Sequence, residues 1–198
     1  MKNIIFIALL LVNFVCFSQK SPIPKIDFKE LAEKQNSYVN LLNLKDENSL
    51  IIKIGFKSYW SGGIHTHLIV FQNDGTVKKF NVFFPNDSLK RIKISKKSIR
   101  KEQIAEYWEF LQSIAAENKL DIDKNKLNID RIKFEDGTVL KYSSRSDGVE
   151  ESFEIIQGNK STYFSTYDAL YQMEQKNAGY EEIQKLVNLI NEVESLIK

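Results

Sequence analysis

Apolar and polar residues alternate over several short stretches of the chain, and turn residues separate these stretches. In one of them, Ile52, Ile54 and Phe56 share a face and lysines occupy the other, which is the period of a β-strand with one buried face. Hairpin turn residues at 73–75, 135–137 and 158–159 predict antiparallel pairing of the strands that they join. The predicted strands cover about 50–59, 64–72, 76–84, 91–95, 131–134, 138–143, 151–157 and 161–167.

Two longer segments repeat their apolar residues at the spacing of an amphipathic helix. The first runs from about residue 98 to 118, and its stripe consists of Ile104, Tyr107, Trp108, Leu111, Ile114 and Ala115. The second runs from about 181 to 197, and its stripe consists of Ile183, Leu186, Val187, Ile190, Val193 and Ile197. Asp27 and Glu30 have the spacing of a capping box, which predicts a further helix from Phe28 to about Gln35, with Leu44 as its farthest end.

These elements predict an α+β fold. Hairpins give an antiparallel sheet of about six strands, and each amphipathic helix needs an apolar surface to cover. The amphipathic helices therefore pack on one face of the sheet, and the other face is partly solvated or available for binding. No linker interrupts this pattern, so residues 19–198 are expected to form one domain. The Asp-Gly-Thr-Val sequence at 74–77 recurs at 136–139, which we interpret as hairpin chemistry rather than as a true repeat.

The first eighteen residues have the pattern of a bacterial secretory signal peptide. Lys2 precedes an apolar run from Ile4 to Val15, and Ser18 supplies a small residue for cleavage. The run is too short for a membrane-spanning helix, which needs about 20 apolar residues. Lipidation at Cys16 is the alternative, but the residues before this cysteine fit a lipobox poorly. We therefore expect export to the periplasm or the exterior, without a transmembrane anchor in the mature chain.

Composition narrows the chemistry further. The one cysteine lies within the predicted signal peptide, so the mature chain has no thiol nucleophile and no disulfide. A net charge of +2 is too small for nucleic-acid or membrane binding driven by bulk charge. No nucleotide or cofactor signature is present, and no cofactor is predicted.

His65 and His67 are the only histidines. Residues two apart on a strand point to the same face, so the two rings could supply half of a zinc site, with carboxylates as the other ligands. The simpler interpretation is a pair of polar residues on a solvated strand face. The metal interpretation predicts a metal-dependent hydrolase.

A run of cations forms the densest charge feature, and no acid interrupts it before Glu102. It lies on a short predicted strand and at the predicted start of a helix, where cations oppose the helix dipole. The run predicts a surface for an anionic partner or envelope component, and its alternative is a solvated lysine-rich face. Its members are Lys90, Arg91, Lys93, Lys96, Lys97, Arg100 and Lys101.

Aromatic residues do not interleave with this run, so nucleic acid is not an expected partner. Phe80, Val82 and Phe84 share one face of a strand while Phe83 occupies the other, which is typical of a strand buried twice or covered by a partner. The sequence thus favours an exported, non-enzymatic binding or interaction protein of the bacterial envelope or exterior. One form of this is an inhibitor or immunity protein. The alternative is a metal-dependent hydrolase that uses His65 and His67.

Overall fold

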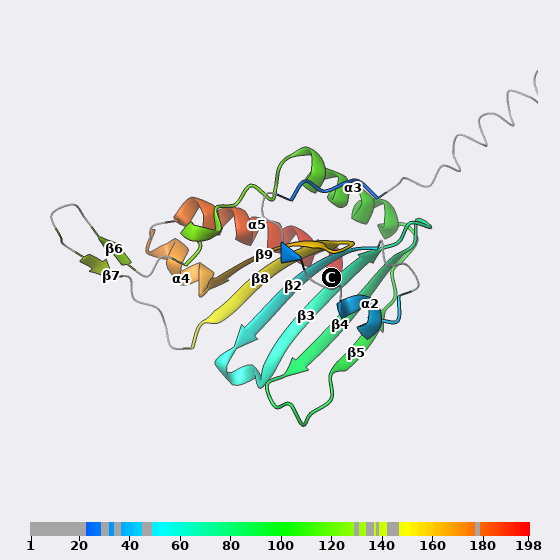
Figure 1. Cartoon of the computed structure of the whole chain (residues 1–198), viewed down its shortest axis with the longest axis horizontal. Coiled ribbons are helices and arrows are strands. Elements are labelled where there is room, and N and C mark those ends of the chain that lie inside the picture. The colour runs from blue at the N-terminus through cyan, green and yellow to red at the C-terminus, as the bar shows by residue number, and fades with distance from the viewer. Residues whose placement is uncertain are drawn as a thin grey trace, which may run out of the picture.

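Seven antiparallel strands form one sheet, in the order β1-β9-β8-β2-β3-β4-β5 (Figure 1). The computed structural model describes residues 23–28, 32–33, 37–44, 49–128, 131–133, 137, 139–141, 147–176 and 179–198, so the predicted signal peptide lies outside the described residues. The strands of this sheet are β1 (Ala32–Glu33), β2 (Leu50–Ser58), β3 (Gly63–Phe71), β4 (Val77–Pro85), β5 (Lys93–Lys97), β8 (Val149–Gln157) and β9 (Lys160–Tyr167). The first of them has only two residues, so six longer strands make up the body of the sheet.

The remaining elements are helices and one separate hairpin. The helices are α2 (Ser37–Leu41), α3 (Gln103–Ala116), α4 (Ala169–Glu174) and α5 (Tyr180–Ile197), with 3-10 turns η1 (Tyr59–Ser61) and η2 (Lys124–Lys126). The hairpin of β6 (Arg131–Lys133) and β7 (Val139–Lys141) forms a two-stranded sheet of its own. The predicted α+β fold is confirmed, although this hairpin does not join the main sheet. No helix within the described ranges is long and apolar enough to cross a membrane.

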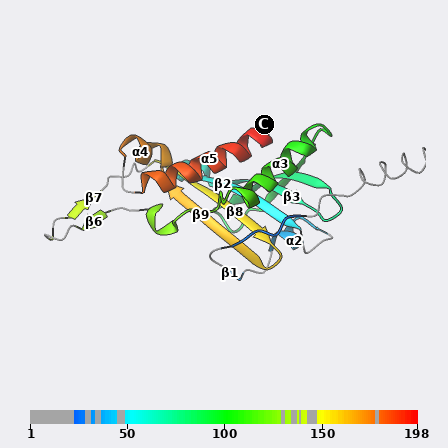
Figure 2. The same ribbon diagram turned by 90° about the horizontal axis from the view of Figure 1, so that it is seen from above.

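The larger core lies between one face of the sheet and the helices α3 and α5 (Figure 2). Alternate residues of β2 point into it, and Ile52 and Ile54 are completely buried there. The end of α5 is held by two side chains from other elements, because its last carbonyl oxygens lack partners within the helix. The Tyr107 hydroxyl donates to the Leu196 carbonyl at 2.5 Å, and Lys79 Nζ donates to the Ile197 carbonyl at 2.9 Å.

A smaller core lies on the opposite face of the sheet, which we call the open face. Here α2 contributes Tyr38, and the loop after it contributes Leu44. These side chains pack on apolar residues of the central strands, among them Ile51 and Val70. Because α2 is only five residues long, it covers only part of this face.

Three local expectations were wrong. Phe28 is not helical and residues 32–33 form β1, because backbone pairing of Ala32 with Ser161 of β9 outweighs the local capping signal. The helix α3 begins at Gln103 rather than near residue 98. On α3 the buried stripe includes Phe110 and leaves Ala115 exposed, while Trp108 is only partly buried and packs edge-on against Phe71.

Candidate functional site

A row of small residues crosses the open face of the sheet. Ser152 of β8, Gly55 of β2 and Thr66 of β3 are direct partners in the strand register, so their side chains lie side by side on one face. Larger residues occupy the rows on either side, and the small row therefore forms the floor of a pocket of about 270 Å³. We call this pocket the Gly55 groove. Its lining residues are Tyr38, Lys53, Gly55, Lys57, Ile64, Thr66, Phe84, Glu150, Ser152 and Tyr163.

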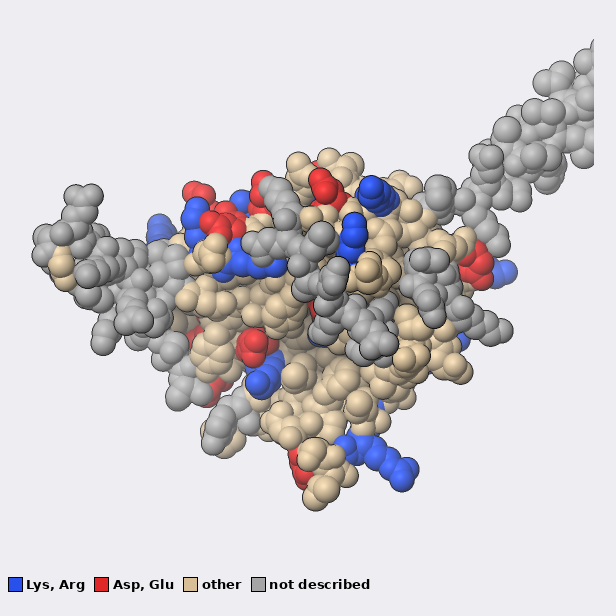
Figure 3. Space-filling view, viewed as in Figure 1, with Lys and Arg blue, Asp and Glu red and all other residues tan. Residues whose placement is uncertain are grey.

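Two ion pairs border this floor, one on each side. Lys53 lies opposite Glu154 in the register, and their charged atoms are 2.9 Å apart. Lys57 lies opposite Glu150, with the corresponding atoms 3.9 Å apart. The first pair is buried, with side chains 15% and 3% exposed, whereas the second is half-exposed at 50% and 38%. The cations and carboxylates at the groove are thus matched in number. Figure 3 views the molecule from the side of α2, and uncharged residues make up most of the described surface in the lower half of this view.

Lys53 lies between two tyrosine rings. Its Nζ atom is 5.5 Å from the centroid of Tyr38 and 5.9 Å from that of Tyr163, within the range of cation–π attraction. Burial by itself lowers the pKa of Lys53, but the Glu154 carboxylate and, to a smaller extent, Tyr38 raise it more, so the pKa lies above its usual value. Lys53 is therefore a fixed ammonium ion that can donate hydrogen bonds at neutral pH.

The floor of the groove carries hydrogen-bonding capacity that the protein does not fully use. Ser152 Oγ donates to the Gly55 carbonyl at 3.3 Å. Thr66 is 1% exposed, and its Oγ1 atom has no hydrogen-bond partner among the described residues. A Cβ atom on Gly55 would lie 2.7 Å from Ser152 Oγ and 3.9 Å from Thr66 Oγ1, so both hydroxyls border the space above this glycine. Leaving a buried hydroxyl unpaired costs about 1–3 kcal/mol, so an unpaired group of this kind calls for an explanation, and a bound ligand is one such explanation.

The two histidines lie on the face of the sheet that carries the larger core, near the start of β3. They share this face by their strand positions, His65 opposite Phe83 and His67 opposite Asn81. The ring centroids of His65 and Phe83 are 4.7 Å apart, and His67 Nδ1 is 3.0 Å from Asn81 Oδ1. Within the described parts of the chain, no three His, Cys, Asp or Glu side chains form a group that could hold a metal ion. Metal binding by the histidines stays a prediction, which zinc analysis of the protein and of a His65→Ala, His67→Ala double variant would test.

The basic run lies on the edge of the sheet and in the segments beside it. All seven of its cationic side chains are exposed. Lys93 and Lys97 of β5 point to the face opposite to that of Lys96, so the run does not form one flat surface. Because α3 begins only at Gln103, the cations do not occupy its first turn, and the expected conflict with the helix dipole is absent. Lysines on an edge strand are a common protection against unwanted strand pairing, and partner binding by this run stays a prediction.

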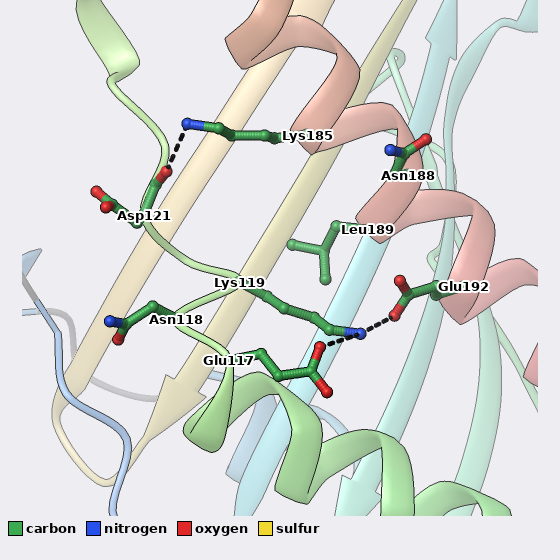
Figure 4. Close-up of a pocket in the computed structure, with 8 residues that line it drawn as sticks. All are labelled: Glu117, Asn118, Lys119, Asp121, Lys185, Asn188, Leu189 and Glu192. Carbon is green, nitrogen blue, oxygen red and sulfur yellow. Dashed lines mark hydrogen bonds and ion pairs between the residues drawn. The ribbon is translucent and has the colours of Figure 1, made fainter.

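A second pocket, of about 380 Å³, lies between the end of α3 and α5 (Figure 4). Its charged side chains already pair with one another. Lys119 Nζ lies 2.6 Å from a Glu192 oxygen and 3.6 Å from a Glu117 oxygen, and Lys185 Nζ contacts Glu182 at 2.9 Å. This pocket is larger than the Gly55 groove, and the lysines of both pockets are paired with carboxylates. The buried hydroxyl of Thr66, which has no partner among the described residues, lies at the Gly55 groove, and we therefore regard the groove as the better candidate.

The Gly55 groove was not predicted from the sequence. A glycine inside a strand pattern often marks a place where something approaches the backbone closely, and Gly55 was the one available signal. Its neighbours Ser152 and Thr66 are 97 and 11 residues away in the chain, so only the strand register brings the three together. Searches of protein-family models and of curated protein sequences found no match to this chain.

Proposed function

We propose that this protein is an exported, non-enzymatic binding protein of the bacterial envelope or exterior, and that its ligand occupies the Gly55 groove. The observation that carries the proposal is the floor of the groove, where the buried Thr66 hydroxyl has no partner among the described residues. Ligand pockets typically combine apolar walls with a few polar groups that fix orientation. The groove has this composition, with Tyr38, Phe84 and Tyr163 as aromatic walls.

The polar groups of the groove are suited to holding a ligand rather than to attacking one. Lysine acts as a nucleophile only as a neutral amine, and the Glu154 carboxylate favours the ammonium form of Lys53. Ser152 Oγ donates its proton to the Gly55 carbonyl, so this hydroxyl is oriented toward the backbone rather than toward a general base. Binding without bond breaking therefore fits these side chains best.

Screening of a fragment library by two-dimensional amide NMR tests the proposal. We expect that fragments shift the signals of Gly55, Thr66 and Ser152, and that Gly55→Ala weakens them because its methyl group occupies the groove. Ser95→Ala, on the exposed strand β5, is the control and should retain the shifts. If Gly55→Ala does not fold, Tyr163→Ala replaces it, because Tyr163 is 41% exposed and we expect its truncation to leave the fold intact. Fragments that bind elsewhere, for example between α3 and α5, would overturn the proposal.

A further inference from the structure

We infer that the ligand of the Gly55 groove is an uncharged sugar residue, an inference that rests on the proposed binding function. The groove places hydroxyl groups, two internally neutralised ion pairs and aromatic rings around one small space. Each of these three features restricts the ligand in a different way.

The ion pairs restrict its charge. Lys53 faces Glu154 at 2.9 Å, and Lys57 faces Glu150 at 3.9 Å, so each cation already has its carboxylate. A charged ligand would have to leave its own charge uncompensated or separate one of these pairs. Breaking the buried Lys53–Glu154 pair is strongly unfavourable, because the remaining charge stays out of water. An uncharged ligand avoids this penalty.

The floor restricts the hydrogen-bonding groups of the ligand. The hydroxyls of Ser152 and Thr66 can both donate and accept, the ammonium groups of the lysines donate, and the carboxylates accept. A purely apolar ligand would cover these groups without pairing them, which is costly. A ligand whose own groups donate and accept at several positions satisfies them, and hydroxyl groups around a ring have this property.

The walls restrict the shape and the apolar part of the ligand. Tyr38 and Phe84 stand nearly perpendicular to each other, with centroids 6.5 Å apart, and Tyr163 lies across the floor on β9. Aromatic faces carry partial negative charge, so they attract the C–H bonds on the face of a sugar ring. The volume of about 270 Å³ is below the roughly 300 Å³ at which pockets for drug-sized ligands begin. One sugar ring fits this size, and the exposed Tyr163 and Lys57 at the rim leave room for a longer glycan to continue outward.

A glycan array of neutral and acidic oligosaccharides, incubated with protein from a bacterial host that expresses the full chain, tests the inference. Titration calorimetry then compares N-acetylglucosamine, galactose and mannose with glucuronate. We expect binding of neutral glycans, with affinity for glucuronate at least tenfold weaker. Thr66→Val should weaken binding of the neutral sugar at least tenfold. Thr162→Val, a buried threonine on the other face of the same sheet, should leave it unchanged.

The possible failures are distinguishable. Equal or stronger binding of the acidic glycans would overturn the inference, because the matched ion pairs would then not select against charge. No glycan binding, together with fragments that still occupy the groove, would overturn the sugar inference and leave the proposed function intact. Absence of both would overturn both. Equal loss of binding in Thr66→Val and Thr162→Val would place the ligand away from the groove and would also overturn the inference.

Discussion

Replacing Thr66 with valine should stabilise the protein. The substitution exchanges the Oγ1 atom for a methyl group of nearly the same size at a position that is 1% exposed. Since Oγ1 has no hydrogen-bond partner among the described residues, no bond is lost and the cost of burying an unpaired hydroxyl disappears. That cost is about 1–3 kcal/mol. Thermal midpoints of proteins of this size shift by roughly 2–4 °C for each kcal/mol.

Thr166→Val is the matched control for this prediction. Thr166 is also fully buried in the sheet, but its Oγ1 donates to the Leu127 carbonyl at 3.0 Å and accepts from Gln172 Nε2 at 3.2 Å. The same change of atoms therefore removes two hydrogen bonds and should destabilise the protein by about 1–3 kcal/mol. The two variants, made from one residue type in one sheet, should shift stability in opposite directions.

Urea unfolding followed by circular dichroism measures both effects, with the midpoint reporting stability when the slope is unchanged. A loss of stability in Thr66→Val as large as that in Thr166→Val would refute the reasoning. It would mean that Thr66 Oγ1 is paired in solution, for instance with a buried water, and the floor of the groove would then lack its unmet hydrogen-bonding capacity.

Three further predictions concern other parts of the chain. Lys53→Ala removes the ammonium that faces the Glu154 carboxylate and should lower the free energy of unfolding by about 3 kcal/mol. This value is at the lower end of the range for buried pairs because Lys53 keeps some exposure. In urea unfolding, the double change Lys53→Met, Glu154→Leu should recover much of this loss. Burial and then two neighbouring carboxylates raise the pKa of Glu151, so its contribution to stability is present below the unfolded pKa and is lost as pH rises through the folded pKa. Glu151→Gln should therefore raise the melting temperature at pH 7 and change it little at pH 4, and an equal effect at both values would contradict this. The exported protein should begin at Gln19 in an intact-mass measurement, whereas a mass that retains residues 1–18, or that carries acyl chains, would show that this prediction is wrong.

The local sequence pattern was sufficient to predict those strands and helices whose position depends on nearby residues. The period of two and the Asn-Asp-Gly turn located β3 and β4 to within one residue at each end, because the turn chemistry and the buried face agree there. The spacing of the apolar stripe likewise located α5, and every predicted member of the stripe except Ile197 is buried. Where local and long-range preferences disagree, the prediction failed. Asp27 and Glu30 form a plausible helix start, yet the chain adds β1 to the free edge of β9 instead.

The Gly55 groove could not be predicted from the local sequence pattern. A strand pattern shows which residues share a face within one strand, but not which residues of separate strands become neighbours. Ser152, Gly55 and Thr66 each have an ordinary place in an alternating strand, and their alignment depends on two independent registers. The sequence did draw attention to the histidines and the basic run, which are conspicuous by residue type. Little in the sequence indicated the Gly55 groove, because small side chains form the floor of this groove.

The lysines of β5 lie on an edge strand of the sheet, where they bear on pairing with a further strand. Among the described strands β5 pairs with β4 alone, and its other side offers backbone groups to a further strand. A second copy of the chain that added its own β5 antiparallel to this edge would bring Lys93, Lys96 and Lys97 close to the same residues of the first, and like charges across neighbouring strands repel. The edge therefore discriminates against copies of itself, and this discrimination weakens as salt shortens the range of the repulsion. At low salt, pairing of two copies through their β5 edges is therefore disfavoured even when the protein is concentrated.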